Sequence, residues 1–308
     1  MKNSRPSRRT ILSTPGDRWD LLIKQQAAMS DVVMIDLEHA VHRDKKSEAL
    51  DNCTRAVRTL RHSAAEIIVR INNPHDDQFL HDVRALCKNP PSGYLIPKVA
   101  DVADALRAVD AIEWIEAEEN KSGSKPGLWF LIESPGALLQ SEAIAKLPRT
   151  EALLLGHGDL EYSVGFLNRG WVHTPALDFA RHMLVFAAAA GEVDAIDGAI
   201  TGFVDATVVE AQARHSAQMG MAGVLIVSPR QIAPVHRGFR PSDVEIKKAY
   251  RIITAFLAAW RKGSGVAVVD GNFVDDVLAM RAREVLRQAG ETVADFDSVF
   301  YLQQEGGL

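Results

Sequence analysis

The sequence Leu-Ile-Glu-Ser-Pro-Gly at residues 131–136, followed by Leu-Leu-Leu-Gly-His-Gly-Asp at residues 153–159, decides the fold. Each stretch is a short apolar run that stops at glycine or proline, which is typical of a fully buried strand. Each run is also followed by a carboxylate, Glu133 in the first stretch and Asp159 in the second. Two buried strands that each present one acid at the carboxyl end predict a divalent-metal site between neighbouring strands of a parallel sheet.

The same strand pattern recurs along the chain. Six more short runs are apolar and rich in β-branched residues, at positions 10–14, 31–38, 66–71, 93–98, 195–199 and 222–227. Segments with helical spacing separate the strands, including one helix over 134–147 and one that begins at Pro175 and ends at Gly191. Strands that alternate with helices indicate βαβ units, and eight such units predict an α/β fold, the closed (β/α)8 TIM barrel.

The rest of the chain predicts a C-terminal helical extension. Long helices are expected over 242–261 and 275–288, with one strand-like segment over 263–271 between them. We therefore expect a barrel domain over residues 1–240, which would carry any catalytic site, and an extension over residues 241–308.

Composition narrows the class of protein. The chain has 308 residues, of which 47% are hydrophobic and 24% charged, as in a soluble globular protein. The net charge of −5, with both signs spread along the chain, argues against nucleic acid as the main partner. No run approaches the ~20 apolar residues of a membrane span.

The N-terminus and the cysteines bear on location. Residues 1–9 are basic but lack the apolar core of a signal peptide, so we expect a solvated tail, with an anion-binding role for Arg8 or Arg9 as the alternative. Cys53 and Cys87 are too few for a disulfide framework and favour a reducing, cytoplasmic location.

The carboxyl ends of the predicted strands carry the residues that could do chemistry, because active sites of TIM barrels lie there. These residues are Asp36, Glu38, Arg70, Lys98, Glu133, Asp159, Asp197 and Ser228. Glu133 and Asp159 follow consecutive strands, so their backbones should be about 5 Å apart. One or two carboxylates, completed by waters and substrate oxygens, usually hold Mg²⁺. The alternative is that each acid caps the helix after its strand.

The basic residues of this ring have two interpretations each. Arg70 suits bidentate recognition of a substrate carboxylate or carbonyl, or an internal salt bridge to Asp36 or Glu38. Lys98 is expected to pair with an acid of the ring, with a Schiff-base role as the alternative. Lys46 is expected to form an ion pair with Glu38.

The histidines are less informative. His157 precedes Asp159 by two residues and could ligate a metal or transfer a proton, but no other histidine lies at ligand spacing. His39 and His42 flank the loop of Glu38 and could touch substrate. The sequence contains no Gly-x-Ser-x-Gly elbow, P-loop or Gly-x-Gly-x-x-Gly, so serine hydrolases and nucleotide-binding folds lack support.

Several motifs in order resemble those of one family. They are Leu-Ser-Thr-Pro-Gly at 12–16, Asp-Leu-Glu-His-Ala-Val at 36–41 with Lys46, Val-Arg-Ile-Asn at 69–72, Ile-Pro-Lys at 96–98, Ile-Glu-Ser-Pro-Gly-Ala at 132–137, Gly-His-Gly-Asp at 156–159, Ser-Pro-Arg-Gln at 228–231 and Asp-Gly-Asn-Phe-Val-Asp at 270–275. This ordered set covers nearly the whole chain. It resembles the citrate lyase β-subunit-like (CitE-like) branch of the HpcH/HpaI aldolase family, which is related to citramalyl-CoA and malyl-CoA lyases.

The resemblance implies a catalytic apparatus. Mg²⁺ would be bound by Glu133 and Asp159, and Arg70 would contact the acyl or keto-acid part of the substrate. The resemblance also implies a homo-oligomer, a trimer or hexamer, whose C-terminal segment can cover a neighbouring subunit's site and contribute Asp275 to proton transfer. Other residues are expected to contact substrate (Glu38, Pro135 and Gly136) or to support the site from behind (Lys46, Asp36 and His157).

Four positions depart from the family pattern. His39 replaces the acid of Leu-Glu-Asp-Ala-Val, and Gly158 replaces the acid before the metal ligand. Val224 and Ser228 replace a lysine and a histidine. We expect these positions to line or flank the pocket and the thioester-binding region, so they bear on whether the substrate is a CoA thioester.

Three functions are consistent with the sequence. The first is a Mg²⁺-dependent carbon–carbon lyase that cleaves a citryl-, citramalyl- or malyl-CoA-like substrate by a retro-Claisen or retro-aldol step. The second is a class II aldolase on a free 2-keto acid such as pyruvate or oxaloacetate, which would act without CoA. The third is a non-catalytic barrel that binds a metabolite.

Overall fold

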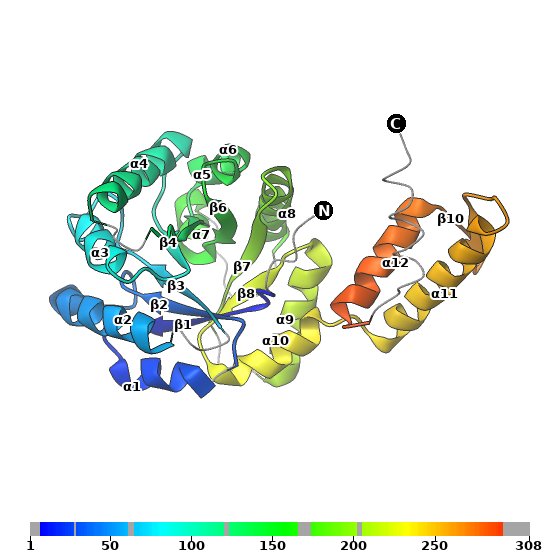
Figure 1. Cartoon of the computed structure of the whole chain (residues 1–308), viewed down its shortest axis with the longest axis horizontal. Coiled ribbons are helices and arrows are strands. Elements are labelled where there is room, and N and C mark those ends of the chain that lie inside the picture. The colour runs from blue at the N-terminus through cyan, green and yellow to red at the C-terminus, as the bar shows by residue number, and fades with distance from the viewer. Residues whose placement is uncertain are drawn as a thin grey trace. The chain divides into compact units, whose positions relative to one another are not determined.

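The chain divides into two compact units, Met1–Phe239 and Arg240–Leu308. The structure is a computed structural model that describes residues 7–27, 29–60, 65–119, 123–165, 174–201 and 205–291. In the first unit, helices surround a central barrel of strands (Figure 1).

Eight parallel strands close the barrel in the order of the sequence, which confirms the predicted fold. They are β1 Thr10–Pro15, β2 Val32–Asp36, β3 Glu66–Arg70, β4 Gly93–Ile96, β5 Gly127–Ile132, β6 Thr150–Leu155, β7 Asp194–Ile200 and β8 Gly223–Ile226. The barrel closes where β1 pairs with β8, with Thr10 opposite Val224.

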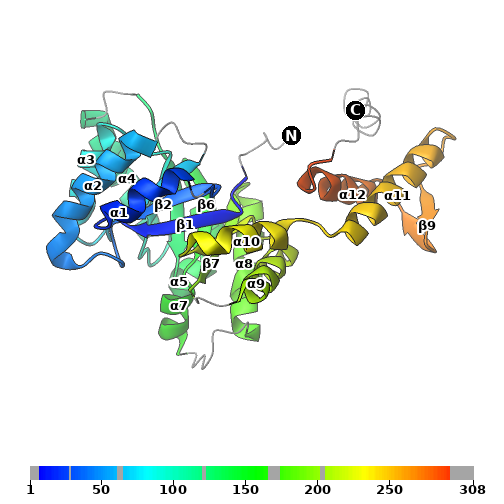
Figure 2. The ribbon, with the colours of Figure 1, turned by 90° about the horizontal axis from the view of Figure 1, so that it is seen from below.

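Helices connect the strands on the outside of the barrel. They are α1 Trp19–Leu22, α2 Lys46–Leu60, α3 Gln78–Cys87, α4 Val102–Glu119, α5 Pro135–Leu139, α6 Ser141–Ala145, α7 His157–Val164, α8 Pro175–Ala190, α9 Ala206–Met219 and α10 Ile232–Phe239, with short 3₁₀ turns η1 Ile23–Ala27, η2 Arg43–Lys45 and η3 Pro229–Gln231. The last two helices, α9 and α10, pack side by side (Figure 2).

Two of the predicted helices differ in detail. The segment 134–147 is not one helix, because Gln140 leaves helical geometry (φ −111°) between α5 and α6. Gly191 follows α8 but does not adopt the left-handed conformation (φ −89°). A Cβ at Gly191 would lie 2.5 Å from the Cβ of Ala145, so the glycine permits close packing of α8 against α6.

Alternation along the strands separates the inside of the barrel from its outside. The interior holds one buried cluster, in which every second residue of a strand takes part, such as Val32 and Met34 of β2 and Trp129 and Leu131 of β5. The intervening residues, such as Val33 and Ile35, pack against the surrounding helices. This parity decides which polar residues reach the interior at the carboxyl end of each strand.

The amino-terminal end of the barrel is closed by Arg8, so the prediction of a solvated tail is wrong at this residue. Arg8 is 5% exposed and lies over the ring of Trp129 at 4.7 Å. Its guanidinium donates to Glu66, Glu151 and Asp194, at the starts of three different strands. Arg8 thus binds acids of the protein itself.

The second unit contains α11 Asp243–Trp260, β9 Ala267–Val269, β10 Asn272–Val274 and α12 Asp276–Gln288 (Figure 2). The predicted single strand is instead an antiparallel hairpin. Asp270 and Gly271 both have positive φ, 50° and 76°, as a type I′ turn requires. The Asp-Gly dipeptide is a strong hairpin signal, and the sequence interpretation overlooked it.

Candidate functional site

Three inward-facing polar residues end the apolar series inside the barrel. Asp36 continues the series of Val32 and Met34, Arg70 follows Ile68 by two, and Glu133 follows Leu131 by two. Because the strands are parallel, these side chains meet at the carboxyl-terminal mouth of the barrel. The mouth therefore gathers charge above an apolar interior.

Glu133 and Asp159 are brought together at this mouth by Lys98. The Lys98 ammonium lies 2.8 Å from Oδ2 of Asp159 and 3.6 Å from Oε2 of Glu133. The backbone N–H of Lys98 donates to Oε1 of Glu133 at 2.8 Å. Neither acid caps a helix through its side chain, since Ser134 caps α5 and Gly156 occupies the N-cap position of α7. Asp159 lies in the first turn of α7, four residues beyond the end of β6.

The two carboxylates differ in their electrostatics. Burial raises the pKa of Glu133 to about 7, although the nearby Lys98 opposes this. Burial acts on Asp159 too, but its hydrogen bond with Lys98 lowers its pKa below the ordinary value. Burial would lower the pKa of Lys98, but its bond to Asp159 and the charge of Glu133 raise it. A lysine held as ammonium is a poor Schiff-base nucleophile, which disfavours that interpretation.

Arg70 is held by Asp36. Nε and Nη2 of Arg70 donate to the two oxygens of Asp36 at 2.7 and 2.5 Å. Asp36 is completely buried and also accepts from the amides of Glu38 and Ala40. Burial alone would raise the pKa of Asp36, but the charge of Arg70 keeps it below the ordinary value. The internal salt bridge of the sequence interpretation thus exists, and it uses only one edge of the guanidinium.

Lys46 does not form the predicted ion pair with the Glu38 carboxylate. Its ammonium donates to the carbonyl oxygens of Leu37 and Glu38, each at 2.6 Å, and so fixes the loop after β2. The carboxylate oxygen Oε2 of Glu38 is buried without a hydrogen bond from any described residue. It lies 3.8 Å from Nε of Arg70 and 3.3 Å from Nδ1 of His39.

Asp197 lies outside the barrel, so its predicted place in the mouth ring is wrong. It is in the middle of β7, and its side chain points to the face of the strand that packs against the helices, whereas the side chain of the preceding Ile196 points into the barrel. Its carboxylate accepts from Arg181 of α8 at 3.0 Å and from Ser216 of α9 at 2.5 Å. Nε2 of His157 lies 2.8 Å from the same carboxylate. His157 therefore faces β7 and is tied to this buried network.

The departures from the family pattern have separate structural settings. Val224 of β8 is buried against helices on the outside of the barrel, which contradicts the expectation that it lines or flanks the pocket. Ser228 caps η3 in a capping box with Gln231. His39 stands beside Glu38 at the mouth. A Cβ at Gly158 would meet nothing within 4 Å, so the missing acid leaves open space.

The remaining predicted site residues lie at the starts of helices. Pro135 and Gly136 open α5, and a Cβ at Gly136 would lie 2.5 Å from the carbonyl oxygen of Ala100. Asp275 is the N-cap of α12 in the second unit and accepts from the amide of Leu278 at 2.9 Å. Each of these residues thus has a local structural role, whatever its part in catalysis.

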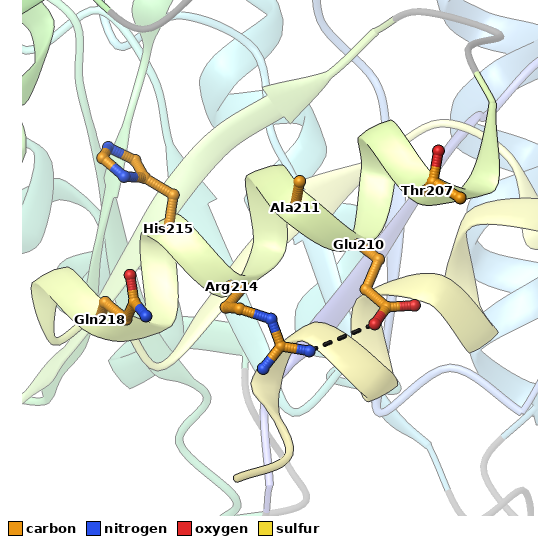
Figure 3. Close-up of a pocket in the computed structure, with 6 residues that line it drawn as sticks. All are labelled: Thr207, Glu210, Ala211, Arg214, His215 and Gln218. Atoms are coloured by element: carbon orange, nitrogen blue, oxygen red, sulfur yellow. Dashed lines mark hydrogen bonds and ion pairs between the residues drawn. The ribbon is translucent and has the colours of Figure 1, made fainter. Parts of the chain in front are cut away.

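A surface hollow lies along α9 (Figure 3). Its lining residues are Thr207, Glu210, Ala211, Arg214, His215 and Gln218. The buried residues of α9 are Val209, Ala213 and Ser216, so the hollow lies on the opposite, outer face of the helix. It is distinct from the charged mouth.

In the part of the chain that the structure describes, no group of three or more histidine, cysteine or acidic side chains is placed to hold a metal ion. None of the described helices is long and apolar enough to cross a membrane.

Comparison with known proteins identifies the family. The profile of the HpcH/HpaI aldolase/citrate lyase family matches residues 9–229. The chain belongs to the HpcH/HpaI aldolase/citrate lyase family. The predicted family is confirmed, and with it the prediction of an enzyme of the lyase class.

Relatives of the chain include two enzymes of Cereibacter sphaeroides. A (3S)-malyl-CoA thioesterase is 31% identical over 94% of this chain and 96% of its own length. An L-malyl-CoA/beta-methylmalyl-CoA lyase is 32% identical over 93% of this chain and 95% of its own length.

Solved structures share the fold. Protein CitE from Mycobacterium tuberculosis, in complex with magnesium, acetoacetate and coenzyme A, matches 92% of this chain and 99% of its own with a TM-score of 0.76 at 24% identity. A citrate lyase from Burkholderia xenovorans matches 97% of both chains with a TM-score of 0.81 at 22% identity.

Proposed function

We propose that this chain is a Mg²⁺-dependent lyase that cleaves a carbon–carbon bond in a malyl-CoA-like thioester, within the class of citryl-, citramalyl- and malyl-CoA substrates. The observation that carries the proposal is the pair Glu133 and Asp159, which share one cation, Lys98, at the barrel mouth. The names of the lyase relative from Cereibacter sphaeroides and of the CitE complex support the substrate class and the metal.

The donor set fits Mg²⁺. This ion is usually bound by one or two carboxylates, with waters and substrate oxygens as the other ligands. Glu133 is 4% exposed, and its raised pKa reflects the cost of ionising it there, which a cation would offset. The ammonium of Lys98 already shows that a positive charge is accommodated between the two acids. When bound, Mg²⁺ supplies a Lewis acid that stabilises negative charge on substrate oxygens.

Arg70 is proposed to bind the acidic or carbonyl end of the substrate. Asp36 occupies Nε and Nη2, and Nη1 makes no bond to a described residue. A guanidinium held along one edge presents its other donors in a fixed direction, which lowers the entropy lost when it binds a carboxylate. Glu38 lies beside it with one carboxylate oxygen unbonded to the described residues and is proposed to contact a substrate hydroxyl.

Proton transfer is proposed for Asp275, on the resemblance of Asp270–Asp275 to the closing segment of the family. The carboxylate would accept or return the proton that moves when the carbon–carbon bond breaks. Such a role requires Asp275 to reach a mouth, in its own chain or in a neighbouring subunit of a homo-oligomer.

Substitution of the two ligands tests the metal site. Glu133→Gln and Asp159→Asn should each abolish Mg²⁺ binding in titration calorimetry and abolish cleavage of malyl-CoA. Asp110→Asn, an exposed acid of α4, is the matched control and should bind Mg²⁺ as the wild type does. Unchanged Mg²⁺ affinity in both mouth variants would reject the assignment.

Thioester hydrolysis is a second candidate, because the chain is 31% identical to the thioesterase and 32% identical to the lyase. Lyase action on malyl-CoA leaves the thioester intact in acetyl-CoA, whereas hydrolysis releases a free thiol. A thiol reagent distinguishes the two reactions. Cys53 and Cys87 are both buried, so the folded protein contributes little signal.

Turnover of free pyruvate or oxaloacetate without CoA would instead favour the aldolase, and binding without turnover would favour a non-catalytic barrel.

A further inference from the structure

Lys98 contacts both Glu133 and Asp159, and it uses its backbone as well as its side chain. Its backbone amide and its ammonium both contact Glu133, and the ammonium also contacts Asp159. Its backbone is left-handed, with φ 59°, a conformation that residues other than glycine, asparagine and aspartate adopt rarely. This backbone conformation directs the amide and the side chain of one residue toward the same pair of carboxylates.

The position of the ammonium conflicts with a bound divalent ion. Mg²⁺ lies about 2.0–2.1 Å from its oxygen ligands and requires near-octahedral geometry. The ammonium takes up an Asp159 oxygen at 2.8 Å and approaches the Glu133 oxygen that faces the same space. A divalent ion shared by these acids must displace the ammonium, which would otherwise add repulsion between like charges.

We propose that Lys98 is a tethered counter-cation that occupies the space between Glu133 and Asp159 and competes with the divalent ion for them. This inference rests on the metal site proposed above. Lys98 holds the two carboxylates together when no metal is present and weakens metal binding by its own charge. The hydrogen bond from the backbone N–H of Lys98 to Glu133 does not depend on the Lys98 side chain. It therefore persists in any variant at this position except proline.

Titration of metal-stripped, full-length protein with Mg²⁺ alone, at one fixed pH, tests the proposal. Lys98→Met removes the charge and keeps an unbranched side chain, and its dissociation constant for Mg²⁺ should fall at least about tenfold, or about 1.4 kcal/mol. Lys98→Arg keeps the charge and should stay nearer the wild type than Lys98→Met does. Lys88→Met, at the exposed end of α3, is the control for loss of a lysine and should bind as the wild type does.

Unfolding by urea provides a readout independent of turnover. Without metal, Lys98→Met should be less stable than the wild type, because two neighbouring carboxylates lose their shared cation. Added Mg²⁺ should raise its stability more than that of the wild type, as linkage requires of the tighter binder. Lys98→Gln provides a second neutral variant if the methionine variant does not fold.

The outcomes separate this inference from the metal site. If the wild type binds Mg²⁺ and the neutral variants bind it no more tightly, the competition is overturned and the metal site stands. If neither the wild type nor the neutral variants bind Mg²⁺, the metal site fails and the competition fails with it. Binding by the neutral variants alone would support both.

Discussion

Replacing Asp36 by asparagine tests whether Arg70 depends on a buried carboxylate. Asparagine keeps the shape and one oxygen acceptor, but it removes the charge that faces Nε and Nη2 at 2.7 and 2.5 Å. Removing one partner of a buried ion pair costs about 3–5 kcal/mol, because the other charge stays buried without compensation. The Arg70 side chain is 12% exposed and keeps some contact with water, so we expect a loss of about 3 kcal/mol in the free energy of unfolding.

A second buried pair provides the matched control. Arg149 donates to both oxygens of Glu116 at 2.7 and 2.9 Å, and the two side chains are 16% and 2% exposed. Glu116→Gln should therefore cost a similar free energy in urea unfolding. Only Asp36→Asn should also lower kcat/KM for malyl-CoA, at least about tenfold, because Arg70 loses its fixed direction. An equal fall in kcat/KM in both variants, or none in Asp36→Asn, would refute this reasoning.

Three further changes test other parts of the structure. Gly156→Ala places a methyl group 2.5 Å from the Cβ of Glu133, so calorimetry should show weaker Mg²⁺ binding and unfolding a loss of about 1–3 kcal/mol; wild-type affinity would contradict the predicted clash. Asp275→Asn keeps a good N-cap residue but removes the acid, so stability and Mg²⁺ affinity should stay at the wild-type values while kcat falls at least about 100-fold. A kcat near the wild-type value would exclude Asp275 from proton transfer. Burial raises the pKa of Asp82 from 3.8 to about 6, so the folded state binds the proton of this carboxyl more tightly than the unfolded state does. The stability that comes from this proton is fully present below the unfolded pKa and is lost as pH rises through about 6. Asp82→Asn should therefore gain stability over the wild type between about pH 4 and pH 7, by up to about 3 kcal/mol, and a difference that does not change with pH in urea unfolding would oppose this.

The fold and much of the mouth could be predicted from the sequence, because the alternation of inward and outward residues along a strand is a local pattern. Asp36 follows Val32 and Met34 at intervals of two, and Glu133 follows Leu131 in the same way, so both belong to the inward series. The same counting excludes Asp197, which is one residue from the inward Ile196, and it would have removed that residue from the predicted ring. Counting also places Val224 outside, next to the inward Leu225.

Contacts between distant segments were not accessible in this way. Arg8 meets Asp194 across 186 residues, and no local pattern marks either of them as a partner of the other. The choice of Lys46 between a carboxylate and two carbonyl oxygens likewise depends on the path of the loop after β2, which sequence spacing does not determine. The bridging position of Lys98 depends on a left-handed backbone, which its residue type does not suggest.

The closure of the barrel has a consequence for synthesis of the chain. β1 pairs with β8, so β1 finds its second neighbour in the barrel only after residue 226 has left the ribosome. Until then β1 has one free edge, and the acids at positions 66, 151 and 194 reach Arg8 one after another as translation proceeds. Such long-range closure is slow relative to local helix formation. Nascent chains arrested before β8 should therefore remain open and be cut by protease, whereas release of the complete first unit should bring protection in one cooperative step.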